Sequence, residues 1–299
     1  MMGLGNLIRR NSKLFFKDKA MFFTSLITPI ILLILYTTFL GNVYKQSFLS
    51  AIPTGFELPE KLINANAVVA GQLVSSLLAV CCVTVSFCSN MLMVQDKVSG
   101  ARADLTVTPV KKSTLAVSYY ISTLISTLAI CVAASVICFI YLSNIGWYLS
   151  FKETVLFLLD VILLVMFGTA LSSIINFFLN SQGQISAVGT IVSAGYGFIC
   201  GAYMPVSSFS AGLQKVISFL PGTYGTGLLR NHALNGVFSE LSEMGMPKEF
   251  VTVFKDSIDC NLYFFDKCVS IEAMYAVLCC SVVVLVLAYI ILNVAVKKR

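Results

Sequence analysis

The feature that most constrains the fold of this chain is a set of six long apolar stretches. As helices, all of them are long enough to cross a bilayer core about 30 Å thick. They are Phe22–Tyr44, Ala67–Val94, Leu115–Leu142, Thr154–Leu179, Ile185–Met204 and Ile271–Val296. A soluble protein carries about 25% charged residues, whereas this chain carries 11%. We therefore expect an all-α polytopic membrane protein with six transmembrane helices. A β-barrel is excluded, because its spans are alternating segments of about 10 residues.

The distribution of basic residues indicates how these helices cross the membrane. If both termini face the cytoplasm, more than half of the 20 lysines and arginines lie on that side, as expected for cytoplasmic loops. The far side then carries basic and acidic residues in nearly equal numbers. We expect a multi-pass protein of the plasma membrane with both termini cytoplasmic. Its net charge of +6 requires no nucleic acid as a partner.

Residues 1–21 have the pattern of an amphipathic helix that precedes the first span. Apolar residues from Leu4 to Phe15 recur at helical spacing, and basic residues fill the other faces. The basic residues are Arg9, Arg10, Lys13 and Lys17. This pattern favours a helix that lies in the cytoplasmic interface, in contact with membrane lipids. The alternative is a charged flank without fixed structure that only orients the first span.

The segment 95–114 is the largest cytoplasmic connection between spans. It contains charges of both signs, a glycine and Pro109, which ends any helix. The other cytoplasmic connection, 180–184, is short and uncharged. A cytoplasmic partner would therefore bind the long segment and the N-terminal helix. The alternative is that the long segment is only a solvated connector.

Small residues recur at every fourth position of the fifth predicted span. They are Gly189, Ser193, Gly197 and Gly201. On a helix this spacing places them on one face, which another helix can approach closely. Such a face either lines a pathway or a contact with a second chain, or it packs inside this chain. The sequence leaves both interpretations open.

The residues after the fifth span predict a pair of short helices and a polar loop. The segment 205–236 is too weakly apolar to span the membrane and is broken at Pro221, which favours a re-entrant helix pair in the outer leaflet. Residues 237–270 then form an extracellular loop. Cys260 and Cys268 lie in this loop, either as a disulfide or as two free thiols.

The composition excludes most catalytic chemistry. His232 is the sole histidine, which rules out histidine triads and multi-histidine metal sites, and we expect it to have a structural role near the outer interface. No GxxxxGK[ST] phosphate-binding sequence occurs. Asp160 is an acid inside the fourth span and hence a functional candidate, although its place near the start of the span favours contact with the solvated interface. We expect neither a catalytic site nor a metal site.

Three segments together resemble the type-2 family of ATP-binding-cassette (ABC) exporter permeases. The helix at 1–21 is similar to the family's connecting helix, and the segment 95–114 is similar to the coupling helix that contacts the ATPase subunit. The third likeness is the signature that follows the fifth span. The matching residues are Asp96, Lys97, Gly100, Leu105, Thr108 and Pro109, and then Gly201, Met204, Pro205, Pro221, Tyr224 and Arg230. Arg102 and Asp104 lie in the coupling segment where the family pattern differs, and we expect them to face the ATPase as well.

The resemblance covers nearly the whole chain and implies a single permease domain over residues 1–299. It implies that two permease chains pair, as a homodimer or heterodimer, and that each binds a separate ATPase subunit that holds ATP and magnesium. ATP-driven closure of the ATPases would switch a central pathway between inward-facing and outward-facing states. The second span, with Ser86 and Asn90, and the fifth span would line that pathway. This chain itself would bind no cofactor.

Two rival functions remain at the level of sequence. One is a carrier or channel that works without ATP, which would require a polar relay or an internal repeat. The other is a membrane-embedded enzyme that modifies lipid, which would require clustered carboxylates or histidines. The sequence favours ATP-driven export. Its apolar path, interspersed with hydroxyl groups, favours a hydrophobic or amphipathic cargo.

Overall fold

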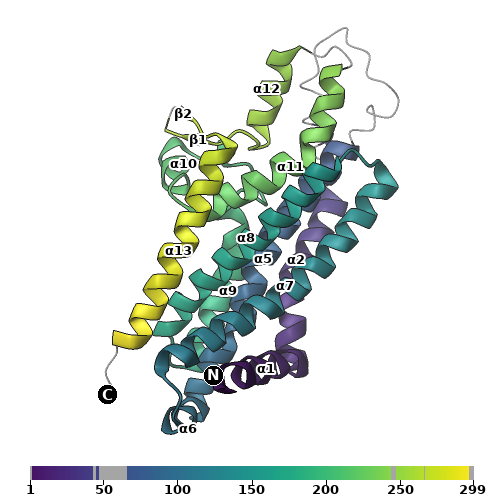
Figure 1. Ribbon diagram of the computed structural model, residues 1–299. Helices are drawn as coiled ribbons and strands as arrows, with labels where there is room; N and C mark the ends of the chain where they lie inside the picture. Colours follow the sequence, from purple (N-terminus) through teal and green to yellow (C-terminus); the bar gives the residue numbers. More distant parts are fainter. Residues whose placement is uncertain (1, 43–44, 47–65, 244–246, 266, 296–299) are drawn as a thin grey trace.

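The computed structural model describes residues 2–42, 45–46, 66–243, 247–265 and 267–295 (Figure 1). Within these residues, five helical segments are long and apolar enough to cross a membrane. They are α2 (Lys19–Leu35) with its π-helical continuation η1 (Tyr36–Leu40), α5 (Asn66–Val98), α7 (Lys112–Ile145), α8 (Phe151–Phe178) and α13 (Ile271–Ala295). The expectation of an all-α polytopic membrane protein is confirmed.

The fifth predicted span is where the structure differs most from the expected set. It forms α9 (Gln182–Ile199), which has 18 residues and is not among the five apolar segments. The helix ends before the predicted Met204 because the chain turns at Gly201, whose φ of 75° is left-handed. The first and last predicted spans are helical over all of their described residues. Their predicted ends, residues 43–44 and 296, lie outside the described part of the chain.

Helix α5 is the centre of the bundle. It packs against α2, α7, α8, α9 and α11, and 94% of its most apolar 18 residues are buried. In α13 only 22% of the most apolar 18 residues are buried, so most of this helix faces outward. An apolar helix with so little cover inside the chain is suited to contact lipid or another protein. The second span therefore forms the core, whereas the last span lies at the periphery.

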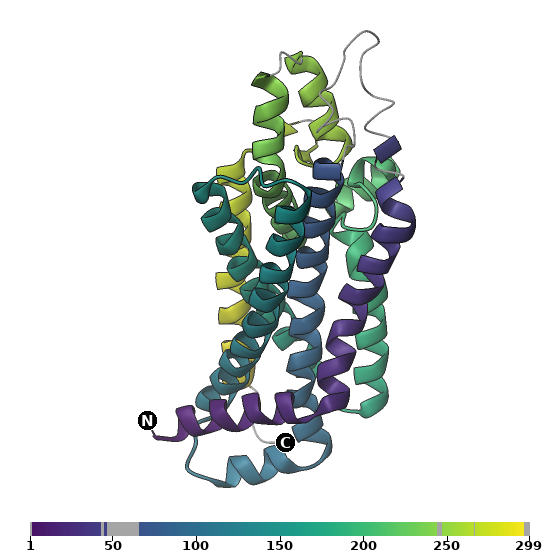
Figure 2. The same cartoon turned by 90° about the vertical axis from the view of Figure 1, so that its right-hand side faces the viewer.

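Short elements cover the two ends of the bundle. At the end that we call proximal, α1 (Met2–Lys17) runs across the long helices next to α6 (Ala101–Val107), and α13 ends there (Figure 2). At the opposite, distal end lie the 3₁₀ turn η2 (Val206–Ser208), α10 (Ala211–Ile217), α11 (Pro221–Glu243) and α12 (Lys248–Ser257). Strands β1 (Tyr263–Phe264) and β2 (Lys267–Cys268) form a small antiparallel hairpin at the same end.

The segment 205–236 forms two helices that are separated before Pro221, as predicted, but the second helix does not end at residue 236. Helix α10 ends at Ile217 and α11 begins at Pro221, where a proline is tolerated because the first helical residue needs no amide donor. Helix α11 then passes residue 236 and continues to Glu243. The loop expected at 237–270 therefore starts inside a helix, and it contains α12 and the hairpin.

Candidate functional site

A groove with a volume of about 900 Å³ lies between α2 and α9, with α5 as its floor. Its walls are mainly apolar, with hydroxyl groups at intervals. The apolar lining includes Met21, Ile27, Ile31, Leu35, Phe39 and Phe198, and the hydroxyl groups are those of Thr24, Thr28, Ser186, Thr190 and Ser193. Asp18, Gln95 and Gln182 also line the groove. Such a surface can hold an apolar body and donate a few hydrogen bonds.

The predicted small-residue face of α9 divides between this groove and packing inside the chain. Gly189 and Ser193 line the groove. A Cβ atom at Gly189 would lie 2.7 Å from Cε of Met91, so this glycine is where α9 approaches α5. A Cβ atom at Gly197 would clash with the ring of Tyr203. Gly201 is not part of the face, because the helix ends before it.

Ser86 and Asn90 are buried between α5 and α8 and do not line the groove. The hydroxyl of Ser86 lies 3.3 Å from that of Thr169. The amide of Asn90 donates to the hydroxyls of Ser172 and Ser173, at 3.0 and 2.9 Å. Polar side chains in an apolar bundle are favourable when they satisfy one another in this way. The structure thus gives these two residues a packing role, in contrast to the pathway role expected for them.

At the proximal end, Arg10 of α1 forms an ion pair with Asp96 of α5. The two guanidinium nitrogens lie 2.7 and 3.0 Å from the two carboxylate oxygens, and the hydroxyl of Tyr119 donates to the same carboxylate at 2.6 Å. The hydrogen bond to Asp96 raises the pKa of Arg10 above its ordinary value. These neighbours bury Asp96. The carboxylate that was expected to face the ATPase is therefore bound by residues of the same chain.

Lys97 is also engaged within the chain. Its ammonium group donates to the carbonyl oxygens of Asn176 at 3.2 Å and Leu179 at 3.0 Å, and to that of Phe177. These carbonyls end α8, and a cation there satisfies groups that have no helical partner. Lys97 therefore joins the ends of α5 and α8, and it is not an exposed contact for a partner.

The exposed part of the coupling segment is α6 and the residues that follow it. Gly100 starts this helix with a left-handed φ of 82°. Arg102 donates to Asn293 of α13 at 3.3 Å, and Leu105 packs against an apolar cluster that contains Leu7 of α1. The exposed residues include Asp104, Val107, Thr108 and Pro109 on this segment, and Arg9, Lys13 and Lys17 on α1.

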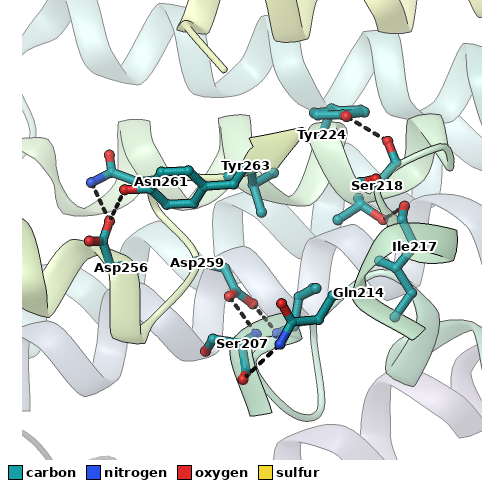
Figure 3. Close-up of a pocket in the computed structure, with 12 residues that line it drawn as sticks. Ser207, Gln214, Ile217, Ser218, Tyr224, Asp256, Asp259, Asn261 and Tyr263 are labelled. Atoms are coloured by element: carbon teal, nitrogen blue, oxygen red, sulfur yellow. Dashed lines mark hydrogen bonds between the residues drawn. The ribbon is translucent and has the colours of Figure 1, made fainter. Parts of the chain in front are cut away.

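At the distal end, Arg230 of α11 is buried in a second polar cluster. Its guanidinium donates to the carbonyl of Gly201 at 2.8 Å, and it lies 3.3 Å from the hydroxyl of Ser76 and 3.4 Å from the carboxylate of Asp259. Asp259 also accepts the backbone N–H groups of Val206 at 2.6 Å and Ser207 at 3.4 Å (Figure 3). Burial raises the pKa of Asp259, and Arg230 opposes that shift.

The other residues of the predicted signature lie around this cluster. Pro205 precedes η2, and Pro221 begins α11. The hydroxyl of Tyr224 donates to the carbonyl of Ser218 at 2.5 Å, which joins α11 to the end of α10 (Figure 3). A cavity of about 140 Å³ lies beside these residues. The signature thus holds the distal elements to Ser76 of α5 and to the turn that follows α9.

A comparison with protein families decides the assignment of the chain. The sequence profile of the ABC-2 type transporter family matches residues 3–233. The chain belongs to this family. It is a multi-pass membrane permease subunit of an ABC transporter, and the kind of partner with which this family works is an ATPase subunit. No individual curated protein matches the chain.

Asp160 of the permease is fully buried, and this corrects the expectation that it contacts the solvated interface. One carboxylate oxygen lies 2.6 Å from Nδ1 of His232 on α11, and the other accepts the hydroxyl of Tyr275 on α13 at 2.5 Å. Helices α11 and α13 therefore exclude solvent from this part of α8. The single histidine of the permease is buried as part of this cluster, in a packed position.

The two cysteines of the distal segment are free thiols, so the disulfide alternative is wrong for this structure. Cys260 is buried, whereas Cys268 is exposed in β2. Burial raises the pKa of the Cys260 thiol to about 12. The two cysteines thus differ sharply in the reactivity expected of them.

Proposed function

We propose that this permease is half of an ATP-driven exporter that moves a hydrophobic or amphipathic molecule outward along the groove between α2 and α9. The observation that carries the proposal is the groove itself. It is large and mainly apolar, and its walls include exposed apolar side chains such as Ile27, Ile31 and Phe198. A second permease chain, identical or different, would cover this face and complete a pathway between the two copies.

In this proposal the proximal end is cytoplasmic, in the plasma membrane, and both termini lie on that side. Helix α9 counts as a further membrane helix, which gives six, and the segment from η2 to α11 is partly re-entrant from the outer side. The packing of α9 against α5 supports this arrangement, and so does the position of the distal elements at the opposite end of the bundle (Figure 1).

We further propose that α6 and α1 receive the ATPase subunit, which holds ATP and magnesium. The exposed residues Asp104, Thr108 and Pro109 would contact the ATPase, with Arg9 and Lys13 beside them. The buried residues have a different role. Because Arg10 binds Asp96 at the end of α5, a displacement of α1 is transmitted to the helix that forms the floor of the groove.

Crosslinking between two copies tests the groove as a paired surface. Cysteines are placed singly at Ser193 in the groove and at Val284 on the outward face of α13, after the exposed Cys268, Cys279 and Cys280 have been replaced by serine. With a short bifunctional thiol reagent, Ser193→Cys should give a permease dimer and Val284→Cys should not. The proposal fails if only Val284→Cys is crosslinked.

ATP-driven transport is tested in vesicles that contain the permease and its ATPase. A panel of amphipathic fluorescent dyes is offered with ATP or with a non-hydrolysable analogue. Thr190→Trp, which fills the groove, should reduce ATP-dependent movement of any dye that the wild type carries, whereas Val284→Trp should not. Dye movement that is equal with ATP and with the analogue would favour a carrier or channel instead.

A further inference from the structure

An exposed apolar patch lies at the distal end, where α10 and the β1–β2 hairpin meet. Its residues are Leu213, Val216, Phe219, Tyr263, Phe264 and Phe265. Phe219, which follows α10, packs edge-on against Phe264 with ring centroids 5.2 Å apart, and its ring lies 6.2 Å from that of Phe265. Aromatic contacts thus join two segments that are more than forty residues apart in the sequence. A contiguous apolar patch of this kind marks an interaction surface.

Phe265 combines an unfavourable backbone conformation with an exposed ring. Phe265 has a φ of 54°, in the left-handed region where glycine or asparagine is favoured and a bulky residue is strained. Contacts within the chain cover only part of this residue, since 52% of it stays exposed beside the rings of Phe219 and Phe264. About half of an aromatic residue in an unfavourable backbone conformation is therefore left for contact outside the chain.

The position of the patch identifies what covers it. Strand β2 ends at Cys268, and α13, the most apolar candidate span, begins at Ile271. Glu272 is exposed at the start of this helix, and a charged side chain is expected to stay outside the hydrocarbon region. We therefore expect the hairpin, which directly precedes this helix, to lie near the level of the membrane interface. Helices α10 and α13 lie beside the hairpin at this end (Figure 1).

Basic residues accompany the rings. The ammonium group of Lys215 on α10 lies 5.9 Å from the ring centroid of Phe265, and Lys267 is exposed in β2. Aromatic rings with nearby lysines are typical of membrane interfaces, where the rings lie at the headgroup level and the ammonium groups meet phosphates.

We propose that this patch is inserted into the lipid leaflet at the distal end, at the boundary between headgroups and acyl chains, and that Lys215 and Lys267 bind lipid phosphates. The patch then fixes the distal cap to the membrane. Gln214 of α10 donates to the carbonyls of Ser207 at 3.1 Å and Phe209 at 2.7 Å, next to the Asp259 cluster (Figure 3). Lipid contact at the patch therefore holds the elements around Arg230 in place. The hairpin lies beyond the residues that match the family.

Fluorescence quenching by brominated lipids tests this proposal on the full chain. The permease has a single tryptophan, so Trp147→Phe gives a silent background. Phe265→Trp then reports the hairpin and Val216→Trp reports α10, which is 60% exposed at that residue. Val253→Trp on α12 is the matched control, because it is 64% exposed at the same end but lies on a helix beyond the bundle. Each variant is placed in vesicles of phosphatidylcholine and phosphatidylglycerol, with bromine atoms near the headgroup or deep in the acyl chains.

The expected result is a blue-shifted emission and a strong loss of fluorescence for Phe265→Trp and Val216→Trp with the shallow brominated lipid, and a smaller loss with the deep one. Val253→Trp should be quenched by iodide present on both sides of the bilayer and not by either lipid. Iodide quenching of both patch reporters without lipid quenching would overturn the proposal, since the patch would then face water. Protection from both quenchers would overturn it as well, because a protein would then cover the patch. Two reporters on separate elements keep the test valid if one variant does not fold.

Discussion

The guanidinium of Arg10 binds both carboxylate oxygens of Asp96, and this ion pair joins the N-terminal helix to the end of the central helix α5. Tyr119 of α7 donates to the same carboxylate. Asp96, which was predicted to contact the ATPase, and Arg10, which was predicted on the connecting helix, are thus partners of each other. The pair is a continuous physical link from the proximal surface to the floor of the groove.

Loss of this pair should uncouple the permease. Arg10→Ala removes two hydrogen bonds between charged groups and leaves the carboxylate of Asp96 buried without its cation. A hydrogen bond to a charged group contributes about 1.5–3 kcal/mol to stability. We expect lower thermal stability in detergent and a reduced ratio of transport to ATP hydrolysis. Lys248→Ala, at an exposed basic residue of α12 at the opposite end, is the control and should change neither quantity.

The exposed side of α6 should respond differently. Asp104→Lys reverses a charge on the surface, so we expect weaker retention of the ATPase subunit during purification and an unchanged unfolding temperature. The control is Glu249→Lys on α12, an exposed acid at the opposite end. Equal retention of the ATPase by both variants would show that α6 is only a connector.

The buried cluster around Asp160 should contribute strongly to stability. His232→Ala leaves the carboxylate with Tyr275 as its remaining partner, and loss of one hydrogen-bond partner of a buried polar group costs about 1–3 kcal/mol. Thermal unfolding of the solubilised permease measures this effect. Glu272→Gln, at the exposed start of α13, should leave the unfolding temperature unchanged.

Two glycines on α9 separate packing from simple helix effects. Gly197→Ala places a methyl group against the ring of Tyr203, and such overpacking costs about 1–3 kcal/mol. Gly195→Ala meets no atom within 4 Å and should be tolerated. Unfolding temperatures of the two variants provide the comparison. If Gly197→Ala is as stable as Gly195→Ala, the close approach of Tyr203 to α9 is wrong.

The thiols of Cys260 and Cys268 offer a test of burial at the distal end. Because burial raises the pKa of Cys260 to about 12, this thiol is almost fully protonated at pH 8 and should resist maleimide until the protein is unfolded. Cys268 is exposed and should react under the same conditions. Mass spectrometry of the peptides identifies the modified residue. Rapid labelling of Cys260 at pH 8 would contradict its burial.

The parts of the fold that sequence reasoning could predict are those set by local hydropathy. Spans such as α5, α7 and α8 follow from apolar runs whose length matches a bilayer, and the break before Pro221 follows from the chemistry of proline. The end of α9 could not be predicted, because it depends on a left-handed turn at Gly201 whose carbonyl is held by Arg230 from a distant helix.

The candidate site was only partly predictable for a related reason. A motif shows which residue types are present, but burial by other elements decides which of them are available. Asp96 and Asp104 belong to the same predicted segment, yet Arg10 and Tyr119 enclose the first and nothing in the described chain covers the second. Asp160 and His232 were both noticed in the sequence, but only the packing of α11 on α8 brings them together.

The most direct measurement for the central claim is the accessibility of the groove during ATP hydrolysis. Ser193→Cys, in the permease without its exposed cysteines, is labelled in reconstituted complexes by a membrane-impermeant thiol reagent added on the ATPase side. An exporter that alternates between two states should label readily without nucleotide and should be protected when ATP and vanadate trap the closed ATPase pair. Labelling that is the same in both conditions would contradict the assignment of this groove as the ATP-driven pathway.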